Sequence, residues 1–164
     1  MILIKENEDK TRAVYKLADG RYRKVWKTSD EKALSHHVEL LNKFMPHWVI
    51  DSGTTTESMY IDTLPISGKC ADTVEPTQEF IDKIYEFCLG NINTTFPYAH
   101  GDWSLSNIIL TGDDVSIVDW DNVAISKPAD VIAKLHSDLT LAFGDKFTLP
   151  TEFTVPKEAE EITE

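Results

Sequence analysis

The sequence predicts an α+β fold in which a small antiparallel sheet comes first and a mainly helical part follows. Three observations support this class. Residues 2–4, 13–17 and 22–26, rich in β-branched and aromatic residues, are interpreted as three strands. Apolar residues recur at helical spacing in two later stretches, one from Pro76 to Gly90 and one from Pro128 to Gly144. Between these two stretches, residues 108–118 have the pattern of a tight β-hairpin.

The first part of the chain is predicted to be a sheet with one helix. Residues 18–21 are a turn that joins the second and third strands. A helix follows from a capping box in which Thr28 and Glu31 satisfy the first backbone N–H groups, and it ends at Pro46. Two more strands are expected at 49–50 and 59–61, around a turn at 51–53, and residues 62–65 then leave the sheet in extended form.

The second part is predicted to begin with a linker at 69–75. The chain of 164 residues suffices for one compact domain or two small lobes, and we expect a first lobe at 1–64 and a second at 65–150. Residues 151–164 are rich in Glu and poor in apolar groups, which predicts a mobile acidic tail.

Charge and composition narrow the function classes. With 16 basic and 28 acidic residues the formal charge is −12, which disfavours nucleic acid as a partner. No apolar run approaches the length of a membrane span, and the charged start MILIKENEDK does not resemble a signal peptide. Cys70 and Cys88 have neither metal-site spacing nor a disulfide framework. These features predict a cytoplasmic protein that binds no membrane.

Three side chains around the hairpin have the chemistry of a metal-phosphate site. Asp102 and Asn107 precede its first strand, and Asp119 follows its second. A tight hairpin brings the two ends together, so these residues are expected to converge. Two carboxylates and an amide oxygen suit Mg²⁺, which leaves its remaining positions to water and substrate phosphates.

The same residues resemble a known family. His100-Gly101-Asp102, Asn107 five residues later and the run 117–120 (Ile-Val-Asp-Trp) are similar to the catalytic loop and metal-binding Asp of the aminoglycoside phosphotransferase and choline kinase group, relatives of the protein kinases. The resemblance implies a two-lobed protein kinase-like fold with a reduced helical C-lobe, and transfer of a phosphoryl group from ATP with Mg²⁺. It implies that Asp102 is the catalytic base and that Asn107 and Asp119 hold the metal.

The resemblance also implies supporting roles around that loop. His100 would be a structural residue that braces the loop, and Asp121 would assist the metal through water. Asp130, within a Pro-Ala-Asp-Val run, would hydrogen-bond the catalytic-loop backbone. Trp103 would either line the substrate pocket or pack beneath the loop.

The first lobe resembles the nucleotide-binding half of the same fold. Lys27 would hold the α and β phosphates and Glu39 on the first helix would orient it, with Lys24 as the rival lysine because it faces the other side of the strand. Backbone groups of Asp62, Thr63 and Leu64 would bind the adenine edge. The turn at 5–11 has no glycine, unlike the phosphate-binding loop of protein kinases.

The predicted function is therefore a Mg²⁺-dependent kinase acting on a small cationic or neutral alcohol, such as an amino alcohol, a choline-like compound or a sugar. The alternative is a catalytically inactive kinase-like module that binds nucleotide or a partner. Because the second lobe is short, a homodimer that completes the acceptor site is a further expectation.

Overall fold

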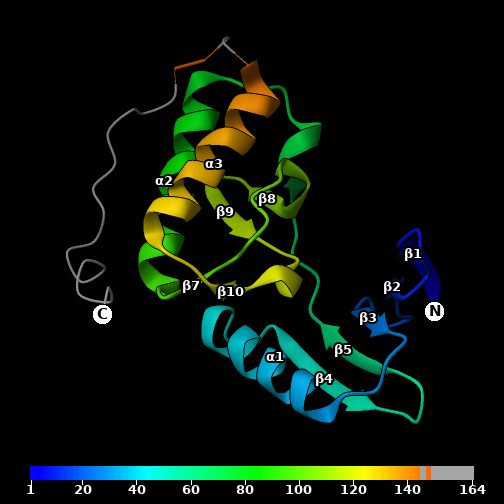
Figure 1. The fold of residues 1–164 in the computed structure, drawn as a ribbon. Coiled ribbons are helices and arrows are strands. Elements are labelled where there is room, and N and C mark those ends of the chain that lie inside the picture. The colour runs from blue at the N-terminus through cyan, green and yellow to red at the C-terminus, as the bar shows by residue number, and fades with distance from the viewer. Residues whose placement is uncertain (145–146, 149–164) are drawn as a thin grey trace, which may run out of the picture. The chain divides into compact units, whose positions relative to one another are not determined.

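The computed structural model describes residues 1–144, 147 and 148 (Figure 1). The chain forms two compact units, Met1–Ile66 and Ser67–Glu164. The first unit is an antiparallel sheet with one helix, and the second holds two long helices with short strands. The predicted α+β class is confirmed. The expected tail at 151–164 lies outside the described residues.

The sheet of the first unit has five antiparallel strands in the order β1-β2-β3-β5-β4. Their bounds are β1 Ile2–Glu6, β2 Arg12–Lys16, β3 Tyr22–Trp26, β4 Val49–Thr54 and β5 Met59–Thr63. Val14 of β2 lies opposite Lys5 of β1 on one side and Lys24 of β3 on the other. Directly opposite residues in antiparallel strands point to the same face, so this register fixes which side chains share a face.

Helix α1 (Glu31–Phe44) connects β3 to β4 and packs against β4 and β5. It buries Leu34, Leu40 and Leu41. The cap differs from the predicted box: the carboxylate of Asp30 accepts the backbone N–H of Ala33, because Asp30 and not Thr28 directly precedes the first turn. On β3, the ring of Trp26 meets the ring of His37 edge-on at 5.9 Å, which places α1 on the Trp26 face of the sheet.

Strand β4 is longer than its sequence indicated. Asp51, Ser52 and Gly53 were predicted to be a turn, but they pair with Asp62, Ile61 and Tyr60 of β5. Gly53 fits this place because the ring of Tyr60 passes over it, where an added Cβ would come within 2.9 Å of the ring. The chain reverses instead between β4 and β5, where the Thr55 backbone N–H donates to the Ser58 carbonyl at 2.7 Å.

A buried ion pair crosses the face of the sheet that lies away from α1. Arg23 of β3 donates to both oxygens of Asp62 on β5, at 2.6 and 2.8 Å, and Asp62 is 0% exposed. The guanidinium of Arg23 also stacks on the ring of Tyr60 at 4.1 Å. Two charged side chains are thereby neutralised inside a sheet of only five strands.

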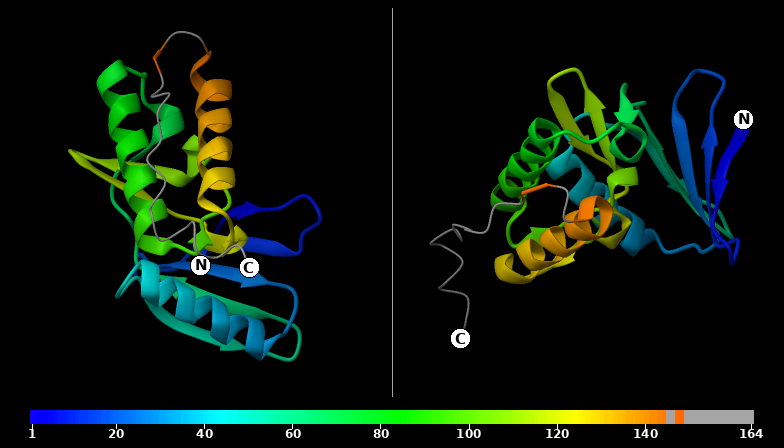
Figure 2. Two further views of the ribbon diagram at one scale, coloured as in Figure 1. Left: turned by 60° about the vertical axis from the view of Figure 1, so that its left-hand side comes forward. Right: turned by 90° about the horizontal axis from the view of Figure 1, so that it is seen from above.

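In the second unit, helices α2 (Gln78–Thr95) and α3 (Pro128–Phe143) lie side by side (Figures 1 and 2). The short elements are β6 Lys69–Cys70, η1 Ala71–Thr73, β7 Tyr98–Ala99, η2 Leu105–Asn107, β8 Ile108–Thr111, β9 Asp114–Ile117, η3 Trp120–Asn122 and β10 Ala124–Ile125. Strands β6, β8 and β9 form one sheet in that order, and β7 pairs with β10. The segment predicted as a linker at 69–75 therefore contributes an edge strand and a 3₁₀ turn.

Helix α2 continues five residues beyond Gly90, where the sequence predicted its end. Ile92 and Thr95 are buried, so packing on the far side of the glycine sustains the helix. The α3 bounds agree with prediction, with Gly144 as the C-terminal cap. Beyond α3, Thr148 exchanges two hydrogen bonds with the Gln78 amide, at 2.9 and 3.0 Å. Along the described part of the chain, no helix has the length and apolarity needed to cross a membrane.

Candidate active site

The β8–β9 hairpin carries the predicted site residues at its open end. Ile108 lies opposite Ile117, so the next pair outward is Asn107 and Val118. The Val118 backbone N–H donates to the Asn107 carbonyl at 2.9 Å. The Val118 carbonyl accepts a hydrogen bond of 2.8 Å from His100 Nε2. Asp119 directly follows Val118, so one residue joins the loop at 100–107 to the predicted metal-binding Asp.

His100 is completely buried beneath this loop. Its Nε2 donates to Val118, and its Nδ1 accepts the backbone N–H of Asp102 at 3.3 Å. The hydrogen-bond pattern assigns a neutral ring protonated on Nε2. Burial lowers the pKa of His100 below its ordinary value of 6.5, which favours the same neutral form. The ring of Trp120 meets the His100 ring edge-on at 4.7 Å, so two hydrogen bonds and an aromatic contact fix the orientation of His100.

Asp102 and Asn107 contact each other directly. Asn107 Nδ2 donates to Asp102 Oδ2 at 2.9 Å, and the Ser104 backbone N–H donates to Asp102 Oδ1 at 3.2 Å. Because the amide nitrogen of Asn107 is used in this way, its carbonyl oxygen is the atom left to bind a cation. Each Asp102 oxygen retains a lone pair for a further hydrogen.

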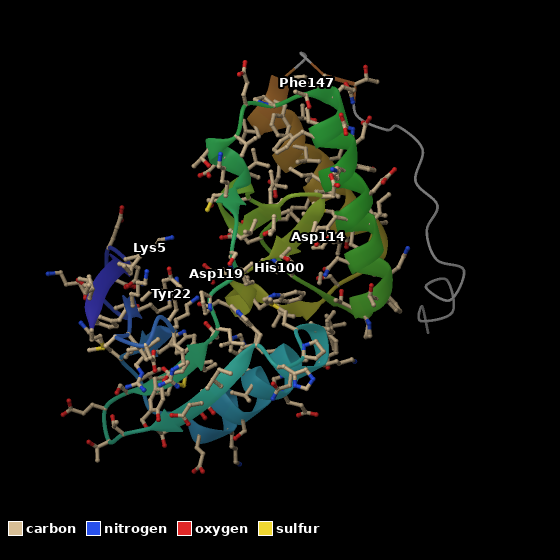
Figure 3. All side chains as sticks on the ribbon, turned by 180° about the vertical axis from the view of Figure 1, so that it is seen from behind. Lys5, Tyr22, His100, Asp114, Asp119 and Phe147 are labelled. Carbon is tan, nitrogen blue, oxygen red and sulfur yellow. The ribbon has the colours of Figure 1, made fainter. Side chains whose placement is uncertain are left out.

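Asp119 has a left-handed backbone, with φ 67° and ψ 59°, immediately before η3. Asp and Asn tolerate this conformation better than most residues. Gly101 is also left-handed, at φ +83°, and a Cβ there would lie 2.3 Å from the Asn122 carbonyl oxygen. The loop and η3 thus approach each other at backbone distance, which only glycine permits. Figure 3 labels His100 and Asp119 at this end of the hairpin.

Trp103 belongs to the packing beneath the loop. It is 1% exposed, and its ring lies 5.7 Å from that of His100. The sequence left open whether Trp103 lines the substrate pocket or packs beneath the loop, and in the structure it packs beneath the loop. A fully buried indole cannot provide a wall for a bound acceptor.

Two further predicted residues lie nearby on different elements. Asp121 is half-buried within η3. Asp130 is exposed in the first turn of α3, and its carboxylate makes no hydrogen bond to any described residue. The hydrogen bond expected from Asp130 to the catalytic loop is not formed among the described residues. The neutral ring of His100 and the Val118 peptide support the loop instead.

In the first unit, the predicted pair of Lys27 and Glu39 does not form. Lys27 lies just after β3, its side chain is 56% exposed, and its ammonium group pairs with Glu6 at 3.7 Å. Glu39 is exposed on α1 and forms no ion pair with any described residue. The physical reason is alternation: Lys27 continues the face of Val25, whereas α1 covers the opposite face, marked by Trp26.

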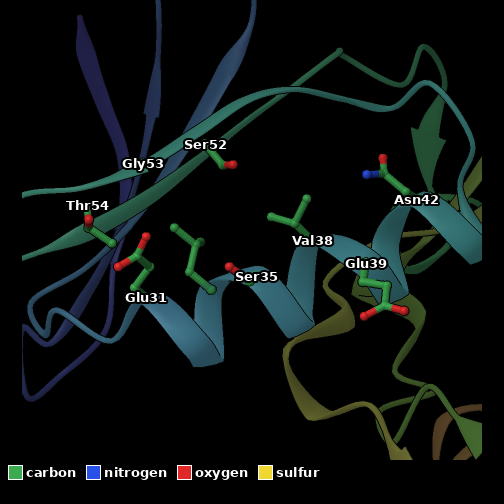
Figure 4. Close-up of a pocket in the computed structure, with 9 residues that line it drawn as sticks. Glu31, Ser35, Val38, Glu39, Asn42, Ser52, Gly53 and Thr54 are labelled. Atoms are coloured by element: carbon green, nitrogen blue, oxygen red, sulfur yellow. The ribbon is translucent and has the colours of Figure 1, made fainter.

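The rival lysine lies on the other face of β3. Lys24 shares the α1 face with Trp26, and its ammonium group lies 5.6 Å from the indole centroid. Glu39 instead borders a groove of about 420 Å³ between α1 and β4, lined in addition by Val38, Asn42 and Ser52 among others. Figure 4 shows the Glu39 carboxylate leaving the helix on the side away from β4.

The backbone positions predicted to bind adenine are engaged in the first unit. Asp62 and Thr63 belong to β5, which is hydrogen-bonded to β3 on one side and β4 on the other. The Leu64 N–H donates to the Trp48 carbonyl at 3.0 Å, and its carbonyl accepts the Trp48 indole N–H at 2.8 Å. A nucleobase would have to replace Trp48 to reach Leu64. The binding role of all three residues stays a prediction.

Metal-binding capacity rests on mixed oxygen donors. Throughout the described residues, no group of three or more His, Cys, Asp and Glu side chains is arranged to hold a metal. The side-chain amide oxygen of Asn107 and the carboxylate of Asp119 are hard oxygen donors of the kind Mg²⁺ accepts, and Mg²⁺ needs only one or two protein carboxylates. The donor set therefore fits Mg²⁺ better than a metal that prefers nitrogen or sulfur.

Comparison with known proteins places this architecture. No protein-family model and no curated protein matches the sequence. Among solved structures, monomeric WbdD matches with a TM-score of 0.60 and 10% identity over 84% of this chain. The aminoglycoside phosphotransferase APH(3'')-Id from Streptomyces rimosus ATCC10970 matches with a TM-score of 0.58 and 17% identity over 87% of this chain.

The fold is kinase-like. This chain spans 38% of the WbdD structure and 78% of the aminoglycoside phosphotransferase. At these identities the likeness establishes the kinase-like fold, and the chemistry has to come from the residues of this chain.

Proposed function

We propose that this protein is a Mg²⁺-dependent phosphotransferase that moves the γ-phosphoryl group of ATP, or of another nucleoside triphosphate, to the hydroxyl of a small acceptor. The observation that carries the proposal is the pair of hydrogen bonds made by the backbone of Val118. Val118 binds His100 through its carbonyl and Asn107 through its N–H, and it leads directly into Asp119. An acid-amide pair and a second carboxylate thus occupy one end of one hairpin, in a chain with a kinase-like fold.

Asp102 would act on the acceptor. Its side chain is fixed by the Ser104 N–H and the Asn107 amide, one on each oxygen. Such a carboxylate orients a hydroxyl by accepting its hydrogen and takes the proton as the oxygen attacks phosphorus. No unusual basicity is needed, because positioning supplies much of the effect in phosphoryl transfer.

Asn107 and Asp119 would hold the metal through their side-chain oxygens. Bound Mg²⁺ neutralises phosphate charge and orients the transferring group. The left-handed backbone of Asp119 turns its side chain out of the β9 direction at the point where η3 begins. His100 takes no part in proton transfer, because both ring nitrogens are committed to the backbone.

Lys24 is proposed as the phosphate-binding lysine in place of Lys27. It lies on the α1 face of β3, whereas Lys27 lies on the other face with Glu6 as its partner. Asp62 is proposed as a structural residue of the sheet, because both of its oxygens are bonded to Arg23.

The acceptor class follows from the distribution of charge. Residues 1–66 carry ten basic and ten acidic residues, whereas residues 67–164 carry six basic and eighteen acidic ones. The unit that holds Asp102 therefore carries the entire formal charge of −12. A cationic or neutral alcohol can approach such a unit, and an anionic one is repelled.

The test begins with ligand-induced stabilisation. Millimolar ATP with Mg²⁺ should raise Tm, because a ligand selective for the folded state stabilises it. Asp119→Asn keeps a side chain that tolerates the left-handed backbone, so it should abolish only the Mg²⁺-dependent part of the shift. Turnover is then sought with a panel of matched cationic, neutral and anionic alcohols. No shift with the wild type at millimolar ATP and Mg²⁺ would remove the basis of the proposal.

A further inference from the structure

One face of the β1–β3 half of the sheet is uniformly cationic. On the face that β3 shares with α1, the charged residues of these three strands are Lys5, Arg12, Lys16 and Lys24, and no carboxylate is among them. The contrast with the rest of the chain is large. Residues 1–27 hold eight basic and four acidic residues, a formal charge of +4, and the remaining residues hold eight and twenty-four, a formal charge of −16.

The register arranges these four cations around a single apolar residue. Lys5 and Lys24 flank Val14 on the neighbouring strands, each one strand spacing of about 4.8 Å away. Arg12 and Lys16 lie two residues before and after Val14 on β2, about 7 Å along the strand in each direction. We call these four residues the Val14 ring. Lysine and arginine side chains are long enough for all four to reach one point above Val14. Figure 3 labels Lys5 of β1 and Tyr22, the first residue of β3.

Two nearby carboxylates, those of Glu6 and Asp9, bond to groups outside the Val14 ring. Glu6 lies opposite Ala13, on the other face, and pairs with Lys27. Asp9 accepts hydrogen bonds from the Thr11 backbone N–H at 3.0 Å and hydroxyl at 2.6 Å. These bonds lower the pKa of Asp9, and the positive charge of Arg12 lowers it further.

Four backbone N–H groups of the β1–β2 turn are bonded within the turn. The Asn7 N–H donates to the Arg12 carbonyl, and the Lys10 N–H donates to the Asn7 carbonyl. Two further N–H groups donate to side chains: that of Thr11 to Asp9, and that of Arg12 to the Asn7 amide oxygen at 2.7 Å. A glycine-rich loop binds phosphates through free N–H groups. The N–H groups of Glu8 and Asp9 are not among these four, and they belong to residues whose own carboxylates repel an anion, so we expect side-chain cations to hold the phosphates.

We propose that the Val14 ring is the polyphosphate-binding site of this protein, in which side-chain cations from three strands replace the backbone amides of a phosphate-binding loop. The phosphate chain of a nucleoside triphosphate lies over Val14, between Lys5 and Lys24, with Arg12 and Lys16 along the strand. This inference rests on the proposed function and adds Lys5, Arg12 and Lys16 to it as phosphate ligands.

The test compares lysines on opposite faces of the same sheet. Lys5→Gln and Lys16→Gln each remove one cation of the ring, and Lys27→Gln is the matched control because it removes a lysine from the other face. Affinities for inorganic tripolyphosphate, ATP and adenosine are measured by calorimetry at low salt. Each ring variant should weaken tripolyphosphate and ATP about tenfold and leave adenosine unchanged, whereas Lys27→Gln should change none of the three. Wild-type affinity for tripolyphosphate should also fall steeply with added salt.

The outcomes separate this inference from the proposed function. If the wild type binds ATP and transfers phosphate while Lys5→Gln and Lys16→Gln bind tripolyphosphate like the wild type, the Val14 ring is wrong and the phosphotransferase proposal stands. If the ring variants lose tripolyphosphate but no acceptor is phosphorylated by the wild type, the ring stands and the reaction is wrong. Equal loss in Lys27→Gln would show a solvated basic sheet with no site, and would overturn the inference.

Discussion

Asn107 Nδ2 and Asp102 Oδ2 are joined by a hydrogen bond of 2.9 Å. The bond links the residue proposed to act on the acceptor with a residue proposed to hold the metal. It also fixes the orientation of the Asn107 amide, since the nitrogen must face the carboxylate and the oxygen must face away. The orientations of the proposed base Asp102 and of the proposed metal ligand Asn107 therefore depend on each other.

Replacing Asp102 by Asn should separate binding from turnover. The variant keeps the size of the side chain but loses the proton acceptor, so turnover should fall by about 10²-fold or more while nucleotide affinity is retained. Both quantities are measured with the best acceptor from the panel and by titration with Mg²⁺ and ATP. Ser106→Ala is the control, because the one hydrogen bond of its hydroxyl to a described residue is with Ser104 Oγ, at 3.1 Å. Unchanged turnover in Asp102→Asn would exclude a catalytic role for this carboxylate.

Gly101→Ala should destabilise the protein more than Gly112→Ala. Both glycines have positive φ, +83° and +59°, so both substitutions carry the strain of a left-handed alanine, about 1–2 kcal/mol. Only Gly101 is crowded, with the Asn122 carbonyl oxygen 2.3 Å from an added Cβ, and the overlap should add about 1–3 kcal/mol. Urea unfolding of the two variants gives the difference directly. Equal losses would mean that η3 is not held against the loop.

The Arg23–Asp62 pair predicts an asymmetric response to removal of either partner. Arg23→Leu leaves a fully buried carboxylate whose remaining ion-pair partner among the described residues is Arg21, at 3.6 Å, and should cost about 3 kcal/mol or more. Asp62→Leu leaves an arginine whose side chain is 31% exposed and can reach water, so its cost should be smaller. The double variant should be more stable than the sum of the two losses predicts. A double-mutant cycle by chemical denaturation checks all three values.

Acid should destabilise the fold through His100. Its pKa is lowered in the folded chain by burial, so below about pH 6.5 the unfolded chain binds this proton more readily. Stability should therefore fall as the pH drops from 6.5, and the loss should level off below the lowered pKa of the folded state. Tm measured from pH 7.5 to 5 should decline less in His100→Gln than in the wild type. His36→Gln, on the exposed side of α1, should retain the wild-type slope.

The sequence predicted the hairpin and its flanking residues because their signals are local. Residues 108–111 and 114–117 are paired strands around a glycine turn, and the composition of the segment specifies that arrangement without reference to distant parts of the chain. The same is true of α3, whose first proline and last glycine mark its ends. Convergence of Asp102 with Asn107 follows from such local geometry.

The first unit was harder to predict because its answer depends on which face a distant helix covers. Strand alternation places Lys24 and Lys27 on opposite faces, but only the contact between Trp26 and His37 shows which face α1 occupies. The pairing of Lys27 with Glu6 likewise depends on a residue 21 positions earlier in the chain, on another strand. Arg23 was missed as the partner of Asp62, since the register of β3 against β5 cannot be read from either segment alone.

The two backbone hydrogen bonds of Val118 determine which substitutions this position tolerates. Its N–H and its carbonyl are common to nearly every amino acid, so almost any side chain at position 118 preserves the bonds to Asn107 and His100. Proline is the exception, because it lacks the N–H. The position that ties the loop to Asp119 thus acts through its backbone atoms, so a survey of tolerated side chains at Val118 would not reveal its importance.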